Sequence, residues 1–330
     1  MYNLPLVVTR CAEMSDPFYQ LQWQLLVDNQ LAAKQIQLWI ATLRCRVPDI
    51  AGNKWLKLKY HIQQIQQHNK TGILSFGGAF SNHLLALAAA GHYFGFQTVG
   101  LVRAHQPDPH NPTLKRCREL GMQLVFVSAE QYRQKQQPDF LTELQQSYPD
   151  LLIVPEGGSS PLALPGLAEL PIQQTPAGPA SLIVSATASG GTLAGLVAAH
   201  PQTPVLGISV VKDNSLPERI SNLLTDNTRR NWQLRHEQSQ SAYGKFNQDT
   251  LQFCLQLART QQIYTEPVYS GKALQSLLLW AQQGNFPCDS KIAFFHTGGL
   301  QGLAGLHYRG LLTDSEFLTL TASAPSQQFR

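Results

Sequence analysis

Short apolar runs alternate with amphipathic segments along most of this chain, and this alternation limits the fold more than any other feature. Apolar runs of strand length lie at residues 38–40, 71–75, 98–102, 124–127, 151–154, 181–184, 205–211 and 291–295. Segments with helical spacing lie between them, at residues 55–62, 81–91, 113–120, 140–148, 192–199, 249–259 and 271–283. Strands that alternate with helices form parallel sheets covered on both faces. The sequence therefore predicts an α/β protein with two open parallel-sheet units and a cleft between them.

The composition is that of an ordinary globular chain. Its 330 residues are 43% hydrophobic and 14% charged, which is enough to bury a large core in one domain or in two closely packed ones. No apolar run approaches the roughly eighteen residues of a membrane span, and residues 1–20 lack a basic start followed by a long apolar run. We therefore expect a cytoplasmic protein that does not cross a membrane.

Charge and cysteine usage exclude several kinds of partner. The net charge is +4 and no long basic run is present, so nucleic-acid binding is not expected. The five cysteines are odd in number, far apart and without a Cys-x-x-Cys pair. This pattern argues against a disulfide framework and against a zinc site, so we expect no metal.

Three glycine-rich loops each follow a predicted strand, at residues 75–83, 187–192 and 296–299. The middle loop, Thr187-Ala-Ser-Gly-Gly-Thr192, opens a predicted helix, where backbone N–H groups and the helix dipole favour an anion such as phosphate. The loop lacks the Gly-Lys-Ser/Thr ending of a Walker loop and is not Gly-x-Gly-x-x-Gly. A tight turn without a ligand is the alternative interpretation.

The first loop ends in Ser81-Asn82-His83 at a predicted helix start, on the edge of the sheet where ligands bind in open α/β folds. The simpler interpretation is that Ser81 or Asn82 is a helix N-cap. A hydrolase is disfavoured because the Gly-x-Ser-x-Gly elbow is absent and no aspartate partner is placed.

A lysine follows a turn signal in Gly52-Asn-Lys54, where a loop enters a predicted helix. Most lysines are solvated surface charges, so this feature is weak evidence when taken alone. A lysine at this position can nevertheless point into a cleft and act as an amine nucleophile.

Six segments together resemble the fold type II pyridoxal-phosphate enzymes, and within them the 1-aminocyclopropane-1-carboxylate deaminases and D-cysteine desulfhydrases. The resemblance spans about residues 38–305, and six short segments in the same order make it specific. They are Gly52-Asn-Lys54 with its trailing Lys-Leu-x-Tyr, Gly77-Gly-Ala-Phe-Ser-Asn-His83, Pro155-Glu-Gly-Gly-Ser-Ser160, Ser189-Gly-Gly-Thr-Leu-Ala-Gly-Leu196, Glu266-Pro-Val-Tyr-Ser-Gly-Lys272 and His296-Thr-Gly-Gly299.

The resemblance implies that the cofactor is pyridoxal phosphate, which acts as an electron sink. It implies that Lys54 is the Schiff-base lysine and, once released, the base that takes the Cα proton. It also implies that Asn82 bonds the ring hydroxyl, and that Ser81, Asn82 and the amide of His83 bind the substrate carboxylate.

Further roles follow from the same resemblance. The phosphate cradle would consist of Ala188, Ser189, Gly190, Gly191 and Thr192. Tyr269 and Tyr243 would be active-site tyrosines near the substrate and the ring. Thr297 would face the pyridine nitrogen, where a neutral hydroxyl does not force ring protonation and the electron sink is milder.

The architecture of such enzymes implies a large cofactor-binding domain of residues 1–53 and 161–330. A small inserted α/β domain would comprise residues 54–160, with the cofactor in the cleft between the two domains. These enzymes are commonly dimers, so a homodimer is expected.

Two positions indicate the substrate by resemblance. The deaminases have a glutamate after the active-site tyrosine and a leucine in the last loop, whereas this chain has Ser270 and Thr297, small hydroxyl residues as in the desulfhydrases. We therefore expect elimination from D-cysteine, or a related β-substituted amino acid, to pyruvate, ammonia and sulfide. If both hydroxyls merely cap neighbouring helices, they carry no information about the substrate.

Other functions remain open at this stage. They are 1-aminocyclopropane-1-carboxylate deamination to 2-oxobutanoate, a synthase or dehydratase similar to cysteine synthase or threonine deaminase, and a binding protein without cofactor. Two departures bear on the substrate. Residues 41–49 stand where the family usually reads Lys-Arg-Asp-Asp, and Leu84-Leu85 stand where Thr-Arg often follows Ser-Asn-His.

Overall fold

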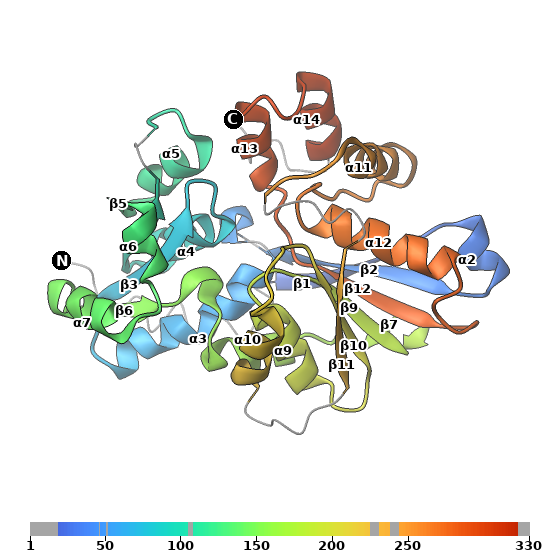
Figure 1. The fold of residues 1–330 in the computed structure, drawn as a ribbon, viewed down its shortest axis with the longest axis horizontal. Coiled ribbons are helices and arrows are strands. Elements are labelled where there is room, and N and C mark those ends of the chain that lie inside the picture. Colours follow the sequence, from blue (N-terminus) through green and yellow to red (C-terminus); the bar gives the residue numbers. More distant parts are fainter. Residues whose placement is uncertain are drawn as a thin grey trace.

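The computed structural model describes residues 19–45, 47–50, 52–104, 108–224, 231–237 and 244–322. These residues form two separate sheets with helices packed on them (Figure 1). The larger sheet has the strand order β1-β2-β12-β9-β10-β11. Its strands are β1 (Tyr19–Leu26), β2 (Gln37–Cys45), β9 (Leu182–Thr187), β10 (Val205–Ser209), β11 (Trp232–His236) and β12 (Lys291–His296).

Neighbouring strands of the larger sheet are parallel except at one edge, where β1 runs antiparallel to β2. The smaller sheet is wholly parallel, in the order β5-β4-β3-β6. Its strands are β3 (Gly72–Gly78), β4 (Gln97–Arg103), β5 (Gln123–Val127) and β6 (Leu151–Val154). The expected α/β fold with two parallel sheets is confirmed. The short strands β7 (Gln174–Thr175) and β8 (Gly178–Pro179) form a separate hairpin.

Helices lie on both faces of the larger sheet, with α11 and α12 on one side and α9 and α10 on the other (Figure 1). The α-helices after the first two strands are α3 (Asn53–Gln67), α4 (Asn82–Phe94), α5 (Pro112–Glu119), α6 (Ala129–Arg133), α7 (Pro138–Ser147), α8 (Leu164–Ala168), α9 (Gly191–Ala199), α10 (Leu216–Leu223), α11 (Gln248–Gln261), α12 (Ser270–Gln282), α13 (Gly302–Tyr308) and α14 (Asp314–Thr321). The short helices are α2 (Asn29–Ala33), η2 (Pro48–Ile50), η3 (Glu156–Gly158) and η4 (Pro161–Ala163). No helix in these residues is long and apolar enough to cross a membrane.

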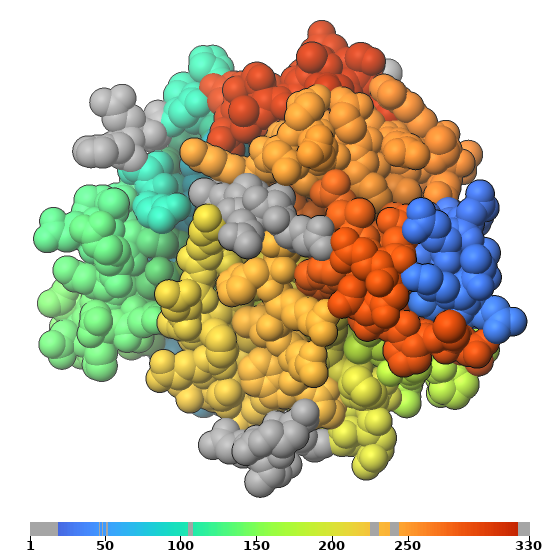
Figure 2. Space-filling view, turned by 45° about the vertical axis from the view of Figure 1, so that its right-hand side comes forward, coloured from blue at the N-terminus to red at the C-terminus, as the bar shows by residue number. Residues whose placement is uncertain are grey.

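The N-terminal part of the described chain is tied to the far end of α12. Lys34 Nζ donates to the carbonyl of Gln282 at 2.6 Å, and the Gln282 side chain donates to Asp28 Oδ2 at 2.9 Å. Figure 2 shows this N-terminal segment in blue beside the orange-red segment around residue 280. The segment that contains α2 is therefore fixed against α12, and the edge strand β1 is fixed against β2.

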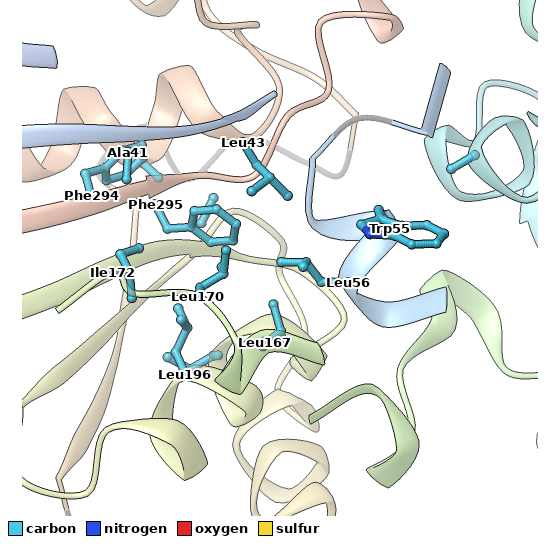
Figure 3. Close-up of a cluster of buried hydrophobic side chains, with 14 of the residues drawn as sticks. Ala41, Leu43, Trp55, Leu56, Leu167, Leu170, Ile172, Leu196, Phe294 and Phe295 are labelled. Atoms are coloured by element: carbon cyan, nitrogen blue, oxygen red, sulfur yellow. The ribbon is translucent and has the colours of Figure 1, made fainter. Parts of the chain in front are cut away.

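The core of the larger sheet reaches the helix that carries the candidate lysine. Figure 3 shows Leu56 of α3 close to Leu167 of α8, with Leu196 of α9 and Phe295 of β12 in the same apolar cluster. All four side chains are fully buried. Burial of side chains of this size stabilises the fold by about 1.5 to 3 kcal/mol each, so the first turn of α3 is firmly fixed.

The residue before Leu56 anchors the same turn on the other side. Trp55 stacks on Phe94 of α4, with ring centroids 5.5 Å apart and planes 18° from parallel. A Cβ at Gly166 would lie 2.0 Å from the Leu56 carbonyl oxygen, so α8 approaches α3 this closely because residue 166 is a glycine. Helix α3 thus joins the helices of both sheets. The division into residues 54–160 and the remainder of the chain stays a prediction.

Candidate active site

Lys54 lies in the first turn of α3, directly after a close contact with the loop that follows β12. The Asn53 N–H donates to the Thr297 carbonyl at 3.1 Å. The N-cap residue Gly52 has φ +84°, and a Cβ there would lie 2.4 Å from the same carbonyl oxygen. Only glycine fits this position, and the contact brings the Gly52-Asn-Lys54 segment against the third glycine loop.

Asn53 connects Lys54 to the predicted phosphate loop. Its side-chain amide donates to Thr192 Oγ1 at 2.7 Å, while its Oδ1 accepts from Lys54 Nζ at 2.8 Å. Asn53 itself is buried. One side chain therefore fixes both the lysine amine and the first turn of α9.

Two opposing influences act on the Lys54 amine. Burial lowers its pKa to about 8, and the nearby carboxylate of Glu266 acts in the opposite direction by favouring the charged form. An amine with this pKa is partly neutral near physiological pH, and the neutral form is the nucleophile and the base. The arrangement suits Lys54 for attack on a carbonyl.

A second lysine, Lys57, lies at the phosphate loop; it opens the Lys-Leu-x-Tyr stretch, for which the sequence predicted no separate role. Lys57 Nζ donates to Ser159 Oγ at 2.7 Å and to Ser189 Oγ at 3.3 Å, and the two hydroxyls are 2.7 Å apart. Its side chain is only 1% exposed. Lys57 is three residues after Lys54, so both share one face of α3, and this spacing was the available signal.

The charge of Lys57 has no acidic partner among the described residues, since it makes no ion pair with a carboxylate there. Burial, together with the charge of Lys54, holds its pKa well below the usual range. Charging this buried amine is costly without a counter-charge, and an anion bound beside it would offset that cost. This charge balance indicates an anionic ligand.

The start of α9 completes a cradle for that anion. Its N-cap residue Gly190 has φ +87° and leaves the first N–H groups of the helix without a side-chain cap. A Cβ at Gly191 would lie 2.8 Å from Ser159 Oγ and 3.2 Å from Lys57 Cε. A buried cation, two hydroxyls and a helix N-terminus therefore converge, and these donors fit the phosphate of pyridoxal phosphate.

The loop after β3 places Ser81 and Asn82 at the start of α4. The Leu84 N–H donates to Ser81 Oγ at 3.3 Å, so Ser81 is the N-cap that the simpler interpretation expected. The Asn82 side chain faces the loop after β12, because a Cβ at Gly302 would lie 3.5 Å from its Oδ1. Asn82 thus lies beside the third glycine loop.

The imidazole of His83 is buried against the smaller sheet. Its Nε2 lies 2.8 Å from the Ser75 hydroxyl, which itself donates to the Val154 carbonyl at 2.7 Å. Burial, with the charge of Lys57 next, holds the His83 pKa well below the usual range. The imidazole is therefore a neutral packing group, which leaves the backbone amide as the part of His83 predicted to bind substrate.

Ser270 does not cap its helix, so that interpretation is wrong. It is the first residue of α12, whose N-cap Tyr269 makes no side-chain cap bond. The buried Ser270 hydroxyl donates weakly to the Gly298 carbonyl at 3.5 Å. Thr297 does not cap a helix either, because α13 begins only at Gly302. The other predicted tyrosine, Tyr243, lies outside the described residues.

A match to a known protein family identifies the family to which the chain belongs. Residues 29–298 match the family described as "Pyridoxal-phosphate dependent enzyme". The chain belongs to this family. Its cofactor is accordingly pyridoxal phosphate, and the resemblance carried by the six segments is confirmed.

Relatives and solved structures agree with this assignment. The chain is 26% identical to a "Putative 1-aminocyclopropane-1-carboxylate deaminase" of Pyrococcus abyssi, and the match covers 78% of this chain and 82% of that protein. It is also 26% identical to the "D-cysteine desulfhydrase" of Serratia proteamaculans, and this match covers 78% of this chain and 85% of that protein. A crystal structure of an "ACC deaminase homologue" superposes with a TM-score of 0.70 at 23% identity, covering 91% of this chain and 94% of that one. This last similarity shows the fold.

Proposed function

We propose that this pyridoxal-phosphate enzyme eliminates sulfide from D-cysteine, or the β-substituent from a related amino acid. With D-cysteine, the Cα proton and the β-thiolate leave, and water converts the product to pyruvate and ammonia. The observation that carries this choice is the buried Ser270 after Tyr269, a neutral hydroxyl where the deaminases have a glutamate. Breaking a carbon–carbon bond without an α-hydrogen would require a more strongly withdrawing ring.

The residues of this chain divide the work. Lys57, Ser159, Ser189 and the N-terminus of α9 would hold the phosphate, and Lys54 would bond to the cofactor aldehyde. When bound, pyridoxal phosphate withdraws electrons from the substrate Cα.

On the substrate side, Ser81, Asn82 and the His83 amide would bind the carboxylate, and Tyr269 and Tyr243 would flank the reacting atoms. The Lys54 amine, with a pKa of about 8, would take the Cα proton as a general base.

The proposal extends to the whole protein. The large domain would consist of residues 1–53 and 161–330 and the small one of residues 54–160, and each sheet draws its described strands from one of these parts. The protein would be cytoplasmic and, as is common among the enzymes it resembles, a homodimer.

Deamination of 1-aminocyclopropane-1-carboxylate is the second candidate, because relatives carry that name. Assays of both substrates separate the two. We expect sulfide and pyruvate from D-cysteine and little or no 2-oxobutanoate from the cyclopropane. Appreciable 2-oxobutanoate, with no sulfide from either cysteine enantiomer, would overturn the proposal. Faster turnover with added acetylserine would instead indicate a synthase.

A further inference from the structure

Glu266 is a buried acid that supports the segment carrying Tyr269. Its side chain is 2% exposed. Its carboxylate accepts the N–H groups of Val268 at 2.7 Å, Tyr269 at 2.9 Å and Ser270 at 2.7 Å. Because α12 has no N-cap side-chain bond, this carboxylate supplies the acceptors that a capping residue would normally provide.

The same carboxylate also lines the candidate active site. A Cβ at Gly299 would lie 3.4 Å from Glu266 Cγ, 3.6 Å from its Oε1 and 3.6 Å from Asn82 Nδ2. Glu266 and Asn82 therefore border one narrow space beside the loop after β12. A helix cap alone does not require such neighbours, so the position of the acid points to a role in the site.

Several charged or titratable groups surround this acid. The loop after β12 connects this acid to Lys54, because Asn53 donates to the Thr297 carbonyl at 3.1 Å and Gly299 lies against Glu266. The carboxylate acts electrostatically on Lys54 of α3 and on the Cys254 thiol of α11, and Lys272 of α12 acts on the carboxylate. Glu237, after β11, lies 4.0 Å from the Lys272 amine and so shares that cation. Burial raises the pKa of Glu266 to about 7, against the effect of its three N–H donors and Lys272. The carboxylate is thus ionised over the pH range in which Lys54, with a pKa of about 8, titrates.

We propose that Glu266 is a positioning residue of the active site. Its carboxylate fixes the segment carrying Tyr269 and Ser270, and it supplies a negative charge that acts on the Lys54 amine. This inference rests on the proposed function only in that Lys54 is the amine that meets cofactor and substrate.

Competitive labelling of amines tests the proposal without cofactor. Cofactor-free protein is labelled briefly with a limiting acylating reagent between pH 6 and pH 10, a range that includes the titration of both Glu266 and Lys54. The labelled fraction of Lys54 is measured by peptide mass spectrometry. We expect Glu266→Gln to move the half-labelling point of Lys54 downward by about one pH unit, because an opposite charge is lost. Glu266→Asp keeps the charge and should leave the half-labelling point close to that of the wild type.

The exposed Glu143 of α7 provides the matched control, and Glu143→Gln should leave the Lys54 curve unchanged. If Glu266→Gln folds but lowers only the melting temperature, with Lys54 titrating as in the wild type, Glu266 is a helix cap and the proposal is wrong. Absence of a pyridoxal-phosphate spectrum in the wild-type protein would contradict the proposed function, and the labelling result would still stand.

Should Glu266→Gln fail to fold, Lys272→Met provides the test. Without the Lys272 cation the acid stays protonated to higher pH, since that cation lowers its pKa. The half-labelling point of Lys54 must then again fall. A Lys54 curve unchanged by Lys272→Met would overturn the proposal.

Discussion

The side-chain amide of Asn53 donates to the hydroxyl of Thr192 at 2.7 Å, and this bond ties the residue before Lys54 to the first turn of α9. The two ends of the cofactor, an aldehyde and a phosphate, must meet a lysine and an anion site at a fixed separation. A buried bond that sets this separation pre-organises the site for the cofactor.

We expect Asn53→Ala to weaken pyridoxal-phosphate binding by about tenfold, because it removes a buried hydrogen bond and leaves the Thr192 hydroxyl without it. Absorbance titration of cofactor-free protein measures the affinity. Asn222→Ala, on the exposed side of α10, is the control. Equal affinities of the two variants would show that Asn53 does not set the geometry.

Lys57→Met should have opposite effects on binding and stability. Loss of a charged donor to the phosphate should reduce cofactor affinity by roughly 10- to 100-fold. The cofactor-free protein should melt about 2 °C higher or more, because a buried cation without a carboxylate partner is replaced by an apolar side chain of similar length. Lys59→Met, which breaks an ion pair with Glu169 and a contact with the Tyr60 ring outside the candidate site, should change neither affinity nor spectrum. A Lys57→Met protein that binds cofactor normally would rule out this anion site.

The two glycines at the start of α9 should respond differently to alanine. Gly191→Ala should weaken cofactor binding more than tenfold with little loss of stability, because the methyl group displaces the Ser159 hydroxyl and Lys57. Gly190→Ala should also destabilise the fold by about 1 to 2 kcal/mol, since its φ is +87° and its Cβ would lie 2.9 Å from Ile220 Cγ1. Calorimetry and cofactor titration of both variants check this difference, which equal losses of melting temperature would refute.

Buried histidines should make the protein sensitive to acid. Burial lowers the pKa of His61 to about 4, despite its bond to the Gly158 backbone. The unfolded chain, with a pKa near 6.5, takes up the proton first, so stability is lost as pH falls from about 6.5 to about 4.

When the pH falls from 7 to 5, protonation linked to His61 should lower the free energy of unfolding by roughly 2 kcal/mol. His61→Gln should reduce the loss of stability by that amount. Urea unfolding at the two pH values measures it. The exposed His68, the C-cap residue of the same helix, is the control residue. Identical pH dependence in wild type and His61→Gln would contradict the prediction.

Local patterns sufficed for most of the architecture. The apolar runs in β9, β10 and β12 are almost wholly buried, as central parallel strands are, and therefore stand out in the sequence. The strand β1 was not predicted, although glutamines alternate with apolar residues in Tyr19–Leu26. Its antiparallel pairing with β2 depends on partners 12 positions away, for Leu26 and Leu38, to 26 positions away, for Tyr19 and Cys45, which local periodicity does not reveal.

The candidate site residues were predicted from segments that precede helices, and the structure places Asn53, next to Lys54, against Thr192 and Thr297 of two of those segments. Lys57, Ser159 and Glu266 stand in three of the quoted segments, but the sequence predicted no role for them because their importance arises from tertiary contacts. Ser159 lies 30 positions before Ser189, and the hydroxyls meet only when the end of β6 reaches the start of α9. Glu266 looks like a surface acid in sequence and becomes significant through burial against Gly299.

Reduction with borohydride followed by peptide mapping tests the central claim most directly. The amines of Lys54 and Lys57 both have lowered pKa values and lie on one face of α3, so either could meet an aldehyde. We predict that the purified protein is yellow and that reduction places the pyridoxyl group on Lys54 alone, with Lys57 unmodified at the phosphate. A pyridoxyl group on Lys57, or on neither lysine, would contradict this account.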